Sequence, residues 1–303
     1  MEKDMNVREY INKNNRLYHY TSENGILGIF KKDEFTLQLS KANSLNDKSE
    51  GKDFYKCLDD VCEKMLEENQ IDIDFFHEIK SLYDYSIAKA AEKTALSRSQ
   101  IVQYRKSLND RKFDFFVMSF SNARDCLPMW NYYTNAGAQG YSIRINKNKL
   151  ISVIQTKSEE YGISHFDFYN VIYSTKEKHK IIHNIIEQAF LSNKVDMVVD
   201  MINEYQYLFK HESFDYEKEV RLIIKAPKIE HQDCTGLKFR ARNGIIVPYL
   251  ELKFDKSPSN LVCEVMVGPL SNDSIAEENL RMYLTYNGYN DFITTTSDIP
   301  IRF

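Results

Sequence analysis

The segment LYHYTS, residues 17–22, places a histidine between two tyrosines and then ends on a threonine and a serine. Tyr18 and Tyr20 are typical of a strand, because aromatic side chains suit a pleated surface. Strand alternation directs His19 to the face opposite these two tyrosines. Ser22 can cap a helix that begins at the next residue. An imidazole beside a strand-to-helix turn can bind a ligand or form a hydrogen bond within the core, and the sequence leaves both open.

A second polar pattern lies in MSFS, where Ser119 and Ser121 alternate with Phe120. Both hydroxyls therefore share one face of a predicted strand. That face either meets solvent or lines a polar cleft. Trp130, the only tryptophan of the chain, follows in LPMWNYY. Its ring can fill the core or form a wall against which a ligand stacks.

A third pattern lies in YEKEVRLI, residues 216–223, which we interpret as a strand. Alternation places Glu217, Glu219 and Arg221 on one face of that strand. Such a row commonly faces solvent. Alternatively, it lines a cleft in which Arg221 keeps one carboxylate ionised while the other acts on a ligand.

Other motifs that carry chemistry are absent from the sequence. It has no GxGxxG, Walker or GxSxG motif. His179 and His183 lie one helical turn apart, but without a third ligand they predict no metal site. The five cysteines fit neither a zinc site nor a set of disulfides, which indicates a reducing compartment.

The overall composition favours a folded cytoplasmic protein. The 303 residues are 43% apolar and 13% aromatic, enough to bury a substantial core. The formal net charge of −4 provides no overall positive field, so a nucleic-acid partner is not supported by charge. The charged N-terminal segment lacks the apolar centre of a signal peptide, and no apolar run approaches the roughly 20 residues that span a bilayer. We therefore expect no membrane partner.

These candidate residues must be positioned by strands that lie far apart in the sequence. Alternating or apolar runs predict strands at 17–21, 34–40, 113–121, 138–146, 165–174, 216–227, 237–241, 244–254 and 262–269, with a last edge strand within 291–303. Helical spacing predicts helices at 4–14, after Ser22, near Pro128, around Leu150 and at 274–288.

Long helical segments interrupt these strands and do not alternate with them one for one. Three helices are predicted within about 53–110, and one or two more within about 175–210. This order favours an α+β fold with a largely antiparallel sheet over a doubly wound parallel sheet. We interpret the chain as one domain, 1–303, that carries these two helical segments as insertions.

Four blocks of the sequence resemble a known family. LSKANSLNDKSEG, SFSNARDCLPMWNYYTNAGAQGYSIRI, HESFDYEKEVRLI and VCEVMVGP resemble, in the same order, blocks of the bacterial domain-of-unknown-function family 2971. The resemblance runs from about residue 17 to 285, and its Met-Trp and Glu-Lys-Glu-x-Arg blocks are the specific ones. That family in turn resembles the ADP-ribosyltransferase-like superfamily, which implies split antiparallel β-sheets around a cleft that binds NAD as substrate.

The resemblance implies roles for residues on three strands. His19 matches the first motif of the superfamily, Ser119 and Ser121 match the second, and Glu217 and Glu219 match the third. It implies that Glu219 stabilises the cationic ribose formed as nicotinamide leaves, that Glu217 activates the acceptor and that His19 binds the ribose. The further NAD-binding residues that it implies are Tyr20, Thr21, Ser119, Ser121, Trp130 and Arg221.

The resemblance leaves more than one function open. The first is an NAD-dependent ADP-ribosyltransferase or NAD glycohydrolase, with an unknown macromolecular acceptor. The second is a nucleotide-binding or regulatory module without turnover, with phage defence left open as its role. A histidine first motif beside a serine second motif is an unusual pairing, which favours this second function. The third is a toxin-type or phage-defence effector that acts on nucleic acid.

Overall fold

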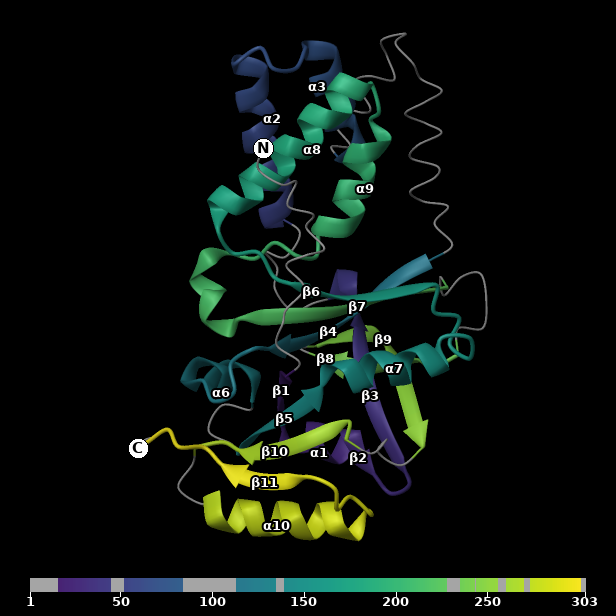
Figure 1. The fold of residues 1–303 in the computed structure, drawn as a ribbon, viewed down its shortest axis with the longest axis vertical. Coiled ribbons are helices and arrows are strands. Elements are labelled where there is room, and N and C mark those ends of the chain that lie inside the picture. The colour runs from purple at the N-terminus through teal and green to yellow at the C-terminus, as the bar shows by residue number, and fades with distance from the viewer. Residues whose placement is uncertain are drawn as a thin grey trace. The chain divides into compact units, whose positions relative to one another are not determined.

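We describe the protein in a computed structural model, which defines residues 16–44, 52–83, 113–134, 139–227, 235–242, 244–255, 260–269 and 273–300 (Figure 1). The chain divides into two compact units. Unit 1 comprises residues 1–44, 113–170 and 215–303, and unit 2 comprises residues 45–112 and 171–214. The helices predicted at 4–14 and at the end of the 53–110 segment lie outside the described residues.

Unit 1 contains the strands and most of the short helices. Its strands are β1 (Arg16–Ser22), β2 (Phe30–Lys31), β3 (Glu34–Lys41), β4 (Phe113–Ser121), β5 (Gly140–Asn146), β6 (His165–Asn170), β7 (Glu219–Pro227), β8 (Leu237–Arg242), β9 (Ile245–Asp255), β10 (Val262–Val267) and β11 (Ile293–Thr296). Its helices are α1 (Glu23–Ile29), η2 (Ala42–Ser44), α6 (Leu127–Tyr133), α7 (Lys147–Lys157) and α10 (Asp273–Tyr286). The 3-10 helix η3 (Glu212–Glu217) leads from unit 2 into β7.

The described strands form an 11-stranded sheet in the order β11-β10-β5-β1-β4-β3-β9-β8. In addition, β2 pairs with β3, β7 pairs with β4, and β6 pairs with β7. Neighbouring strands are antiparallel except β10 and β11, which run parallel. The predicted α+β class with a largely antiparallel sheet is therefore confirmed.

Strand β4 is the branch point of the sheet. One edge of β4 pairs with β7 along its whole length, from Phe113 to Ser121. The other edge is shared, because Val117 pairs with Ser40 of β3 and Ser121 pairs with Tyr18 of β1. Between these pairings β1 and β3 part, and we call this place the fork. The resemblance implied two split sheets, whereas the ladders join into one sheet whose strands part at the fork.

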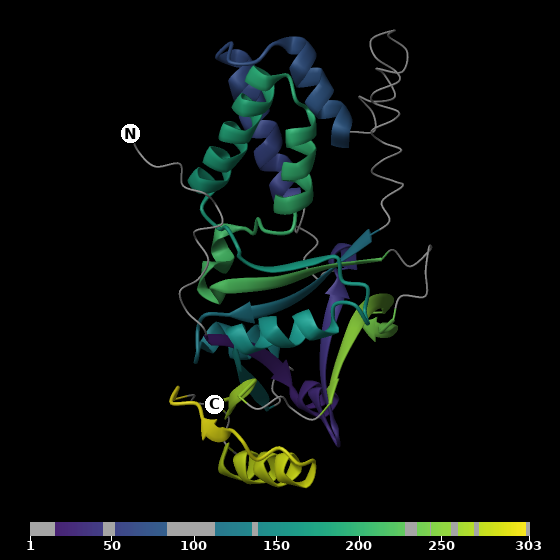
Figure 2. The same ribbon diagram turned by 45° about the vertical axis from the view of Figure 1, so that its right-hand side comes forward.

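The main core lies on one face of this sheet. Alternation sends Met118 and Phe120 of β4 and Ile143 of β5 to this face, as their apolar positions predicted. Helices α1, α7 and α10 cover it with apolar side chains such as Ile26 and Leu150. Ser22 caps α1 by accepting a hydrogen bond from the backbone amide of Gly25, as expected from the sequence. Helix α10 lies beside β11 (Figure 2).

Helix α6 packs on the opposite face of the sheet. Met129 and Trp130 of α6 are buried against Tyr18 and Tyr20 of β1 and Met266 of β10. This smaller cluster fixes α6 over β1 and β10. Trp130 is thus a buried anchor, which is one of the two roles that the sequence left open.

Unit 2 is helical and is assembled from two separate segments. It contains α2 (Lys52–Glu67) and α3 (Ile73–Tyr83) from the first segment, and α8 (Thr175–Ser192) and α9 (Asp196–Tyr205) from the second. Helices α2 and α8 pack together, and the buried Lys178 of α8 forms an ion pair with Asp53 of α2. The sequence predicted both helical segments as insertions of one domain, whereas together they form a compact unit of their own.

Two strand boundaries differ from the sequence prediction by more than two residues. The strand predicted at 165–174 ends at Asn170, because the chain then enters unit 2, where Ile172 forms only an isolated bridge with Phe209. The strand predicted from residue 216 begins at Glu219. Within the part of the chain that the structure describes, no helix has the length and apolar character needed to cross a membrane.

Candidate functional site

A row of polar side chains crosses five adjacent strands on the face opposite the main core. Glu264 of β10 pairs with Arg144 of β5, and Arg144 pairs with Tyr18 of β1. Tyr18 pairs with Ser121 of β4, which pairs in turn with Glu219 of β7. Residues opposite each other in antiparallel strands have side chains about 5 Å apart on the same face. We call these five residues the polar row.

The polar row forms because each strand alternates polar and apolar residues. In β5, Ser142 and Arg144 alternate with Ile143 and Ile145, and the two isoleucines enter the main core. The same alternation in β4 and β7 keeps their hydroxyl, acidic and guanidinium groups out of the main core. Burying the apolar side chains on one face therefore collects the polar groups on the other.

Glu219 and Arg221 form a bidentate ion pair within β7. Arg221 Nε lies 2.8 Å from Glu219 Oε1, and Arg221 Nη2 lies 3.1 Å from Glu219 Oε2. The side chains are only 6% and 1% exposed, so the acidic row does not face solvent. Of the two interpretations that the sequence allowed, the one in which Arg221 holds a carboxylate agrees with this geometry. Arg221 is also directly opposite Ser119 of β4.

Glu217 is not on the strand, contrary to the sequence prediction. It ends η3, and the next residue, Lys218, has a left-handed backbone with φ of 44°. This conformation interrupts the pleat, so the alternation drawn from Glu217 through Glu219 does not hold. Glu217 is nevertheless buried, and its Oε1 accepts a hydrogen bond of 2.6 Å from the hydroxyl of Tyr133 on α6. Burial and this carboxylate both raise the pKa of Tyr133, which keeps its hydroxyl protonated.

Ser121 links the end of β4 to the end of η3 through hydrogen bonds of its hydroxyl. Its buried hydroxyl donates a hydrogen bond of 2.6 Å to the backbone carbonyl of Glu217 and accepts one of 2.9 Å from the amide of Ala123. These two bonds fix η3 beside the loop that follows β4. Ser119 is half-buried, and its side chain lies on the same face as Arg221.

His19 lies on the other face of β1, at the fork. It is opposite Ile143 of β5, and its ring meets Phe120 edge-on with ring centroids 5.9 Å apart. Nδ1 lies 3.0 Å from the backbone carbonyl oxygen of Ser119. Because a carbonyl oxygen only accepts, Nδ1 carries the proton and Nε2 keeps its lone pair. The structure therefore joins the imidazole to the backbone of β4 and places it on the face opposite Glu219.

Burial lowers the pKa of His19, while the bond to Ser119 opposes this shift and the charge of Arg240 adds to it. The unfolded chain therefore binds a proton at His19 more readily than the folded chain does. Stability from this residue is present above the ordinary histidine pKa of about 6.5 and falls as the pH drops from there through the lower folded value. Urea unfolding at pH 7.5 and 5.5 should show a larger loss in the wild type than in His19→Gln. Equal losses in both proteins would contradict this assignment.

The remaining sequence candidates have structural partners. Tyr20 and Trp130 meet edge-on with centroids 4.7 Å apart, and both are buried. The Tyr20 hydroxyl donates to the carbonyl of Ala123, and the Trp130 indole donates to Asp125. Thr21 packs against the first turn of α1, where a Cβ at Gly25 would lie 1.8 Å from the threonine hydroxyl. Neither aromatic ring is an open stacking wall in this structure.

Sequence reasoning missed Arg124, Arg144 and Glu264. Arg124 Nη2 lies 2.6 Å from Glu264 Oε1, and Arg144 Nε lies 3.5 Å from Glu264 Oε2. Burial alone would raise the pKa of Glu264, but hydrogen bonds from Arg124 and Thr295 lower it overall. The signal for Arg144 was present in GYSIRIN, where Ser142 and Arg144 alternate with isoleucines just as the serines of MSFS alternate with phenylalanine.

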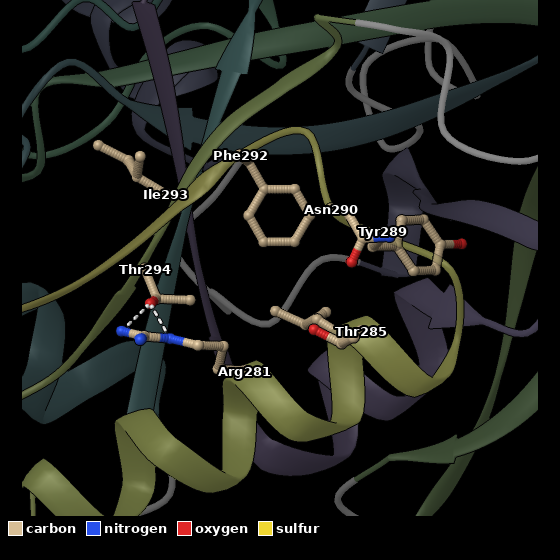
Figure 3. Close-up of a pocket in the computed structure, with 8 residues that line it drawn as sticks. Arg281, Thr285, Tyr289, Asn290, Phe292, Ile293 and Thr294 are labelled. Carbon is tan, nitrogen blue, oxygen red and sulfur yellow. Dashed lines mark hydrogen bonds between the residues drawn. The ribbon is translucent and has the colours of Figure 1, made fainter.

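A surface pocket of about 360 Å³ lies elsewhere in unit 1. Figure 3 shows that its walls come from α10, the turn after it and β11, with Phe292 and Tyr289 on one side and Arg281 bonded to Thr294 on the other. None of the residues predicted from the sequence lines this pocket. The polar row remains the candidate site because it gathers the titratable groups.

Comparison with known proteins supports the family resemblance for part of the chain. Residues 129–222 match a family described as Protein of unknown function (DUF2971). The matched stretch begins in α6 and ends within β7, so it includes Trp130, Arg144, Glu217, Glu219 and Arg221. No curated protein and no solved structure matches the chain. The resemblance to this family is confirmed over that stretch, and the relation to ADP-ribosyltransferases stays a prediction.

Proposed function

We propose that unit 1 uses NAD, either to transfer ADP-ribose to an acceptor or to hydrolyse NAD with water. One observation carries the proposal. Tyr18 from LYHYTS, Ser121 from MSFS and Glu219 from YEKEVRLI are consecutive cross-strand partners, although they come from distant parts of the sequence. The three segments that match the superfamily motifs therefore meet in three adjacent strands.

The reaction would break the bond between the nicotinamide nitrogen and C1′ of the ribose. The bonding electron pair leaves with nicotinamide, and positive charge develops on the ribose. A carboxylate about 4 Å away, at an effective dielectric constant near 20, stabilises that charge by about 4 kcal/mol. This corresponds to roughly a thousandfold in rate. We assign Glu219 to this role, because its ion pair with Arg221 fixes the carboxylate in its ionised form.

The other residues would bind substrate and activate the acceptor. An acceptor hydroxyl loses a proton as its oxygen attacks C1′, and we assign Glu217 as the base that takes it. Tyr133 orients this carboxylate from α6. His19 lies on the sheet face opposite Glu219, so we assign it the role of holding β4 in place through the bond from Nδ1 to the carbonyl of Ser119. The half-buried hydroxyl of Ser119, on the same face as Arg221, would contact the ribose beside Glu219.

Incubation of the purified full chain with NAD tests the proposal, with free nicotinamide measured by chromatography. We expect nicotinamide release above that of a sample without protein, and its amount should grow with protein concentration. A macromolecular acceptor would in addition gain the mass of ADP-ribose. The absence of nicotinamide release, with water and with cell-extract acceptors, would refute the enzymatic proposal.

A nucleotide-binding module without turnover is the second candidate, and one observation favours it. Both candidate carboxylates have strong partners, Glu219 in Arg221 and Glu217 in Tyr133. Buried carboxylates with such partners are typical of structural ion pairs and hydrogen bonds, which need no turnover. Calorimetry distinguishes the two functions, since this module would bind ADP-ribose and NAD with measurable heat and release no nicotinamide.

A further inference from the structure

Two arginines share one buried carboxylate at the β10 end of the polar row. Glu264 accepts bonds from Arg124 and from the hydroxyl of Thr295, and Arg144 lies beside its second oxygen. The Glu264 side chain is 3% exposed, whereas those of Arg124 and Arg144 are 43% and 23% exposed. The cluster therefore buries its negative charge and leaves part of both arginine side chains exposed.

A second carboxylate near Arg124, that of Asp125, is also held by hydrogen bonds. Asp125, whose charge acts on Arg124, accepts hydrogen bonds from the Trp130 indole, the Ser297 hydroxyl and the backbone amide of Asp298. These three donors fix the Asp125 carboxylate. Buried or fixed carboxylates that orient arginines in this way prepare the guanidinium donors for an incoming anion.

Two donors on the same face of β5 have no hydrogen-bond partner among the described residues. Arg144 Nε is buried without a hydrogen bond, because its contact with Glu264 does not meet hydrogen-bond geometry. The hydroxyl of Ser142, two residues earlier on the same face, is also without a partner, and this residue is 1% exposed. A buried polar group without a partner costs free energy, so such groups commonly mark a place where a ligand or water binds.

From this geometry we infer that Arg124 and Arg144 bind the phosphate groups of a nucleotide. The two guanidinium groups come from different segments, the loop after β4 and strand β5. Together they carry more N–H donors than the two oxygens of Glu264 can accept. A pyrophosphate fits this arrangement, and planar guanidinium groups match phosphate oxygens. Arg221 is unsuited to this role because it is buried and Glu219 occupies its donors. The inference rests on the proposed function, which supplies a dinucleotide as substrate.

Isothermal titration calorimetry with ADP-ribose tests the inference. We expect the wild type to bind ADP-ribose, and Arg124→Gln and Arg144→Gln each to bind it about tenfold or more weakly, because each removes charge-assisted hydrogen bonds. Arg124→Lys should recover part of the affinity, since it keeps the charge without the planar donors. Adenosine, which lacks phosphate, should bind no better to the wild type than to the variants. Inorganic pyrophosphate should compete with ADP-ribose.

Arg281→Gln is the matched control, because Arg281 is an exposed arginine that pairs with Glu277 on α10, away from the polar row. Its affinity for ADP-ribose should equal that of the wild type. Wild-type affinity in both Arg124→Gln and Arg144→Gln, or no ADP-ribose binding by the wild type, would overturn the inference. If Arg144→Gln does not fold, Arg124→Gln decides, since the Arg124 side chain is 43% exposed.

The experiments distinguish a failure of the phosphate-site inference from a failure of the enzymatic proposal. If ADP-ribose binding depends on both arginines but the wild type releases no nicotinamide, the phosphate site stands and the enzymatic proposal fails. If the wild type cleaves NAD and Arg124→Gln does so with an unchanged KM, the enzymatic proposal stands and the phosphate site fails.

Discussion

Replacing Glu219 with glutamine should lower nicotinamide release from NAD by about a thousandfold. The substitution keeps the size and shape of the side chain but removes the negative charge that we assign to stabilise the cationic ribose. Binding of ADP-ribose should change much less than the rate, because the developing charge is present only in the transition state. Nicotinamide release under saturating NAD, combined with calorimetry of ADP-ribose, measures the two effects separately.

Glu251→Gln is the control for this experiment. Glu251 is also a buried strand glutamate of unit 1 and pairs with Lys238, but it lies on β9, outside the polar row. Its variant should keep the wild-type rate. A Glu219→Gln protein that is folded and releases nicotinamide at the wild-type rate would remove Glu219 from the mechanism.

Replacing Arg221 with methionine should lower the free energy of unfolding of unit 1 by about 3–5 kcal/mol. Arg221 is 1% exposed and Glu219 is 6% exposed, so the substitution leaves a carboxylate buried without its main counter-charge. Chemical denaturation followed by tryptophan fluorescence reports this loss, because the only tryptophan, Trp130, lies in unit 1.

The double variant Glu219→Gln, Arg221→Met should recover much of that stability, since it removes both charges together. This recovery is the coupling expected of a buried ion pair in a double-mutant cycle. The double variant also provides a second test of catalysis without an unpaired buried charge, and we expect it to be inactive. If the loss of stability in the double variant equals the sum of the losses in the two single variants, the ion pair contributes little to folding.

Much of the fold could be predicted from the sequence because alternation is a local signal. Strand β4 occupies residues 113–121 as predicted, because Phe116, Met118 and Phe120 enter the main core and the two serines alternate with them. The helix after Ser22 was equally predictable from its capping serine. The division into two units was not, because the packing of α2 against α8 joins segments about a hundred residues apart.

The candidate site was only partly predictable. The sequence identified Ser121 and Glu219, which are direct cross-strand partners. It also placed Glu217 on the same strand face, because local alternation cannot show that Lys218 adopts a left-handed backbone. The charge of the 217–221 row favoured solvent over burial, whereas the structure buries both Glu219 and Arg221. His19 was correctly placed opposite Tyr18 and Tyr20, and that very alternation separates it from the polar row.

The two-segment construction of unit 2 limits how such a protein can change during evolution. Deletion of residues 45–112 alone would remove Asp53 and Phe54, leaving the buried ammonium of Lys178 without its acidic partner and Phe209 without a ring that it packs against. Deletion of residues 171–214 alone would strip α2 of its packing partner in the same way. We therefore expect relatives to possess both insertions or to lack both, with few viable intermediates that retain one.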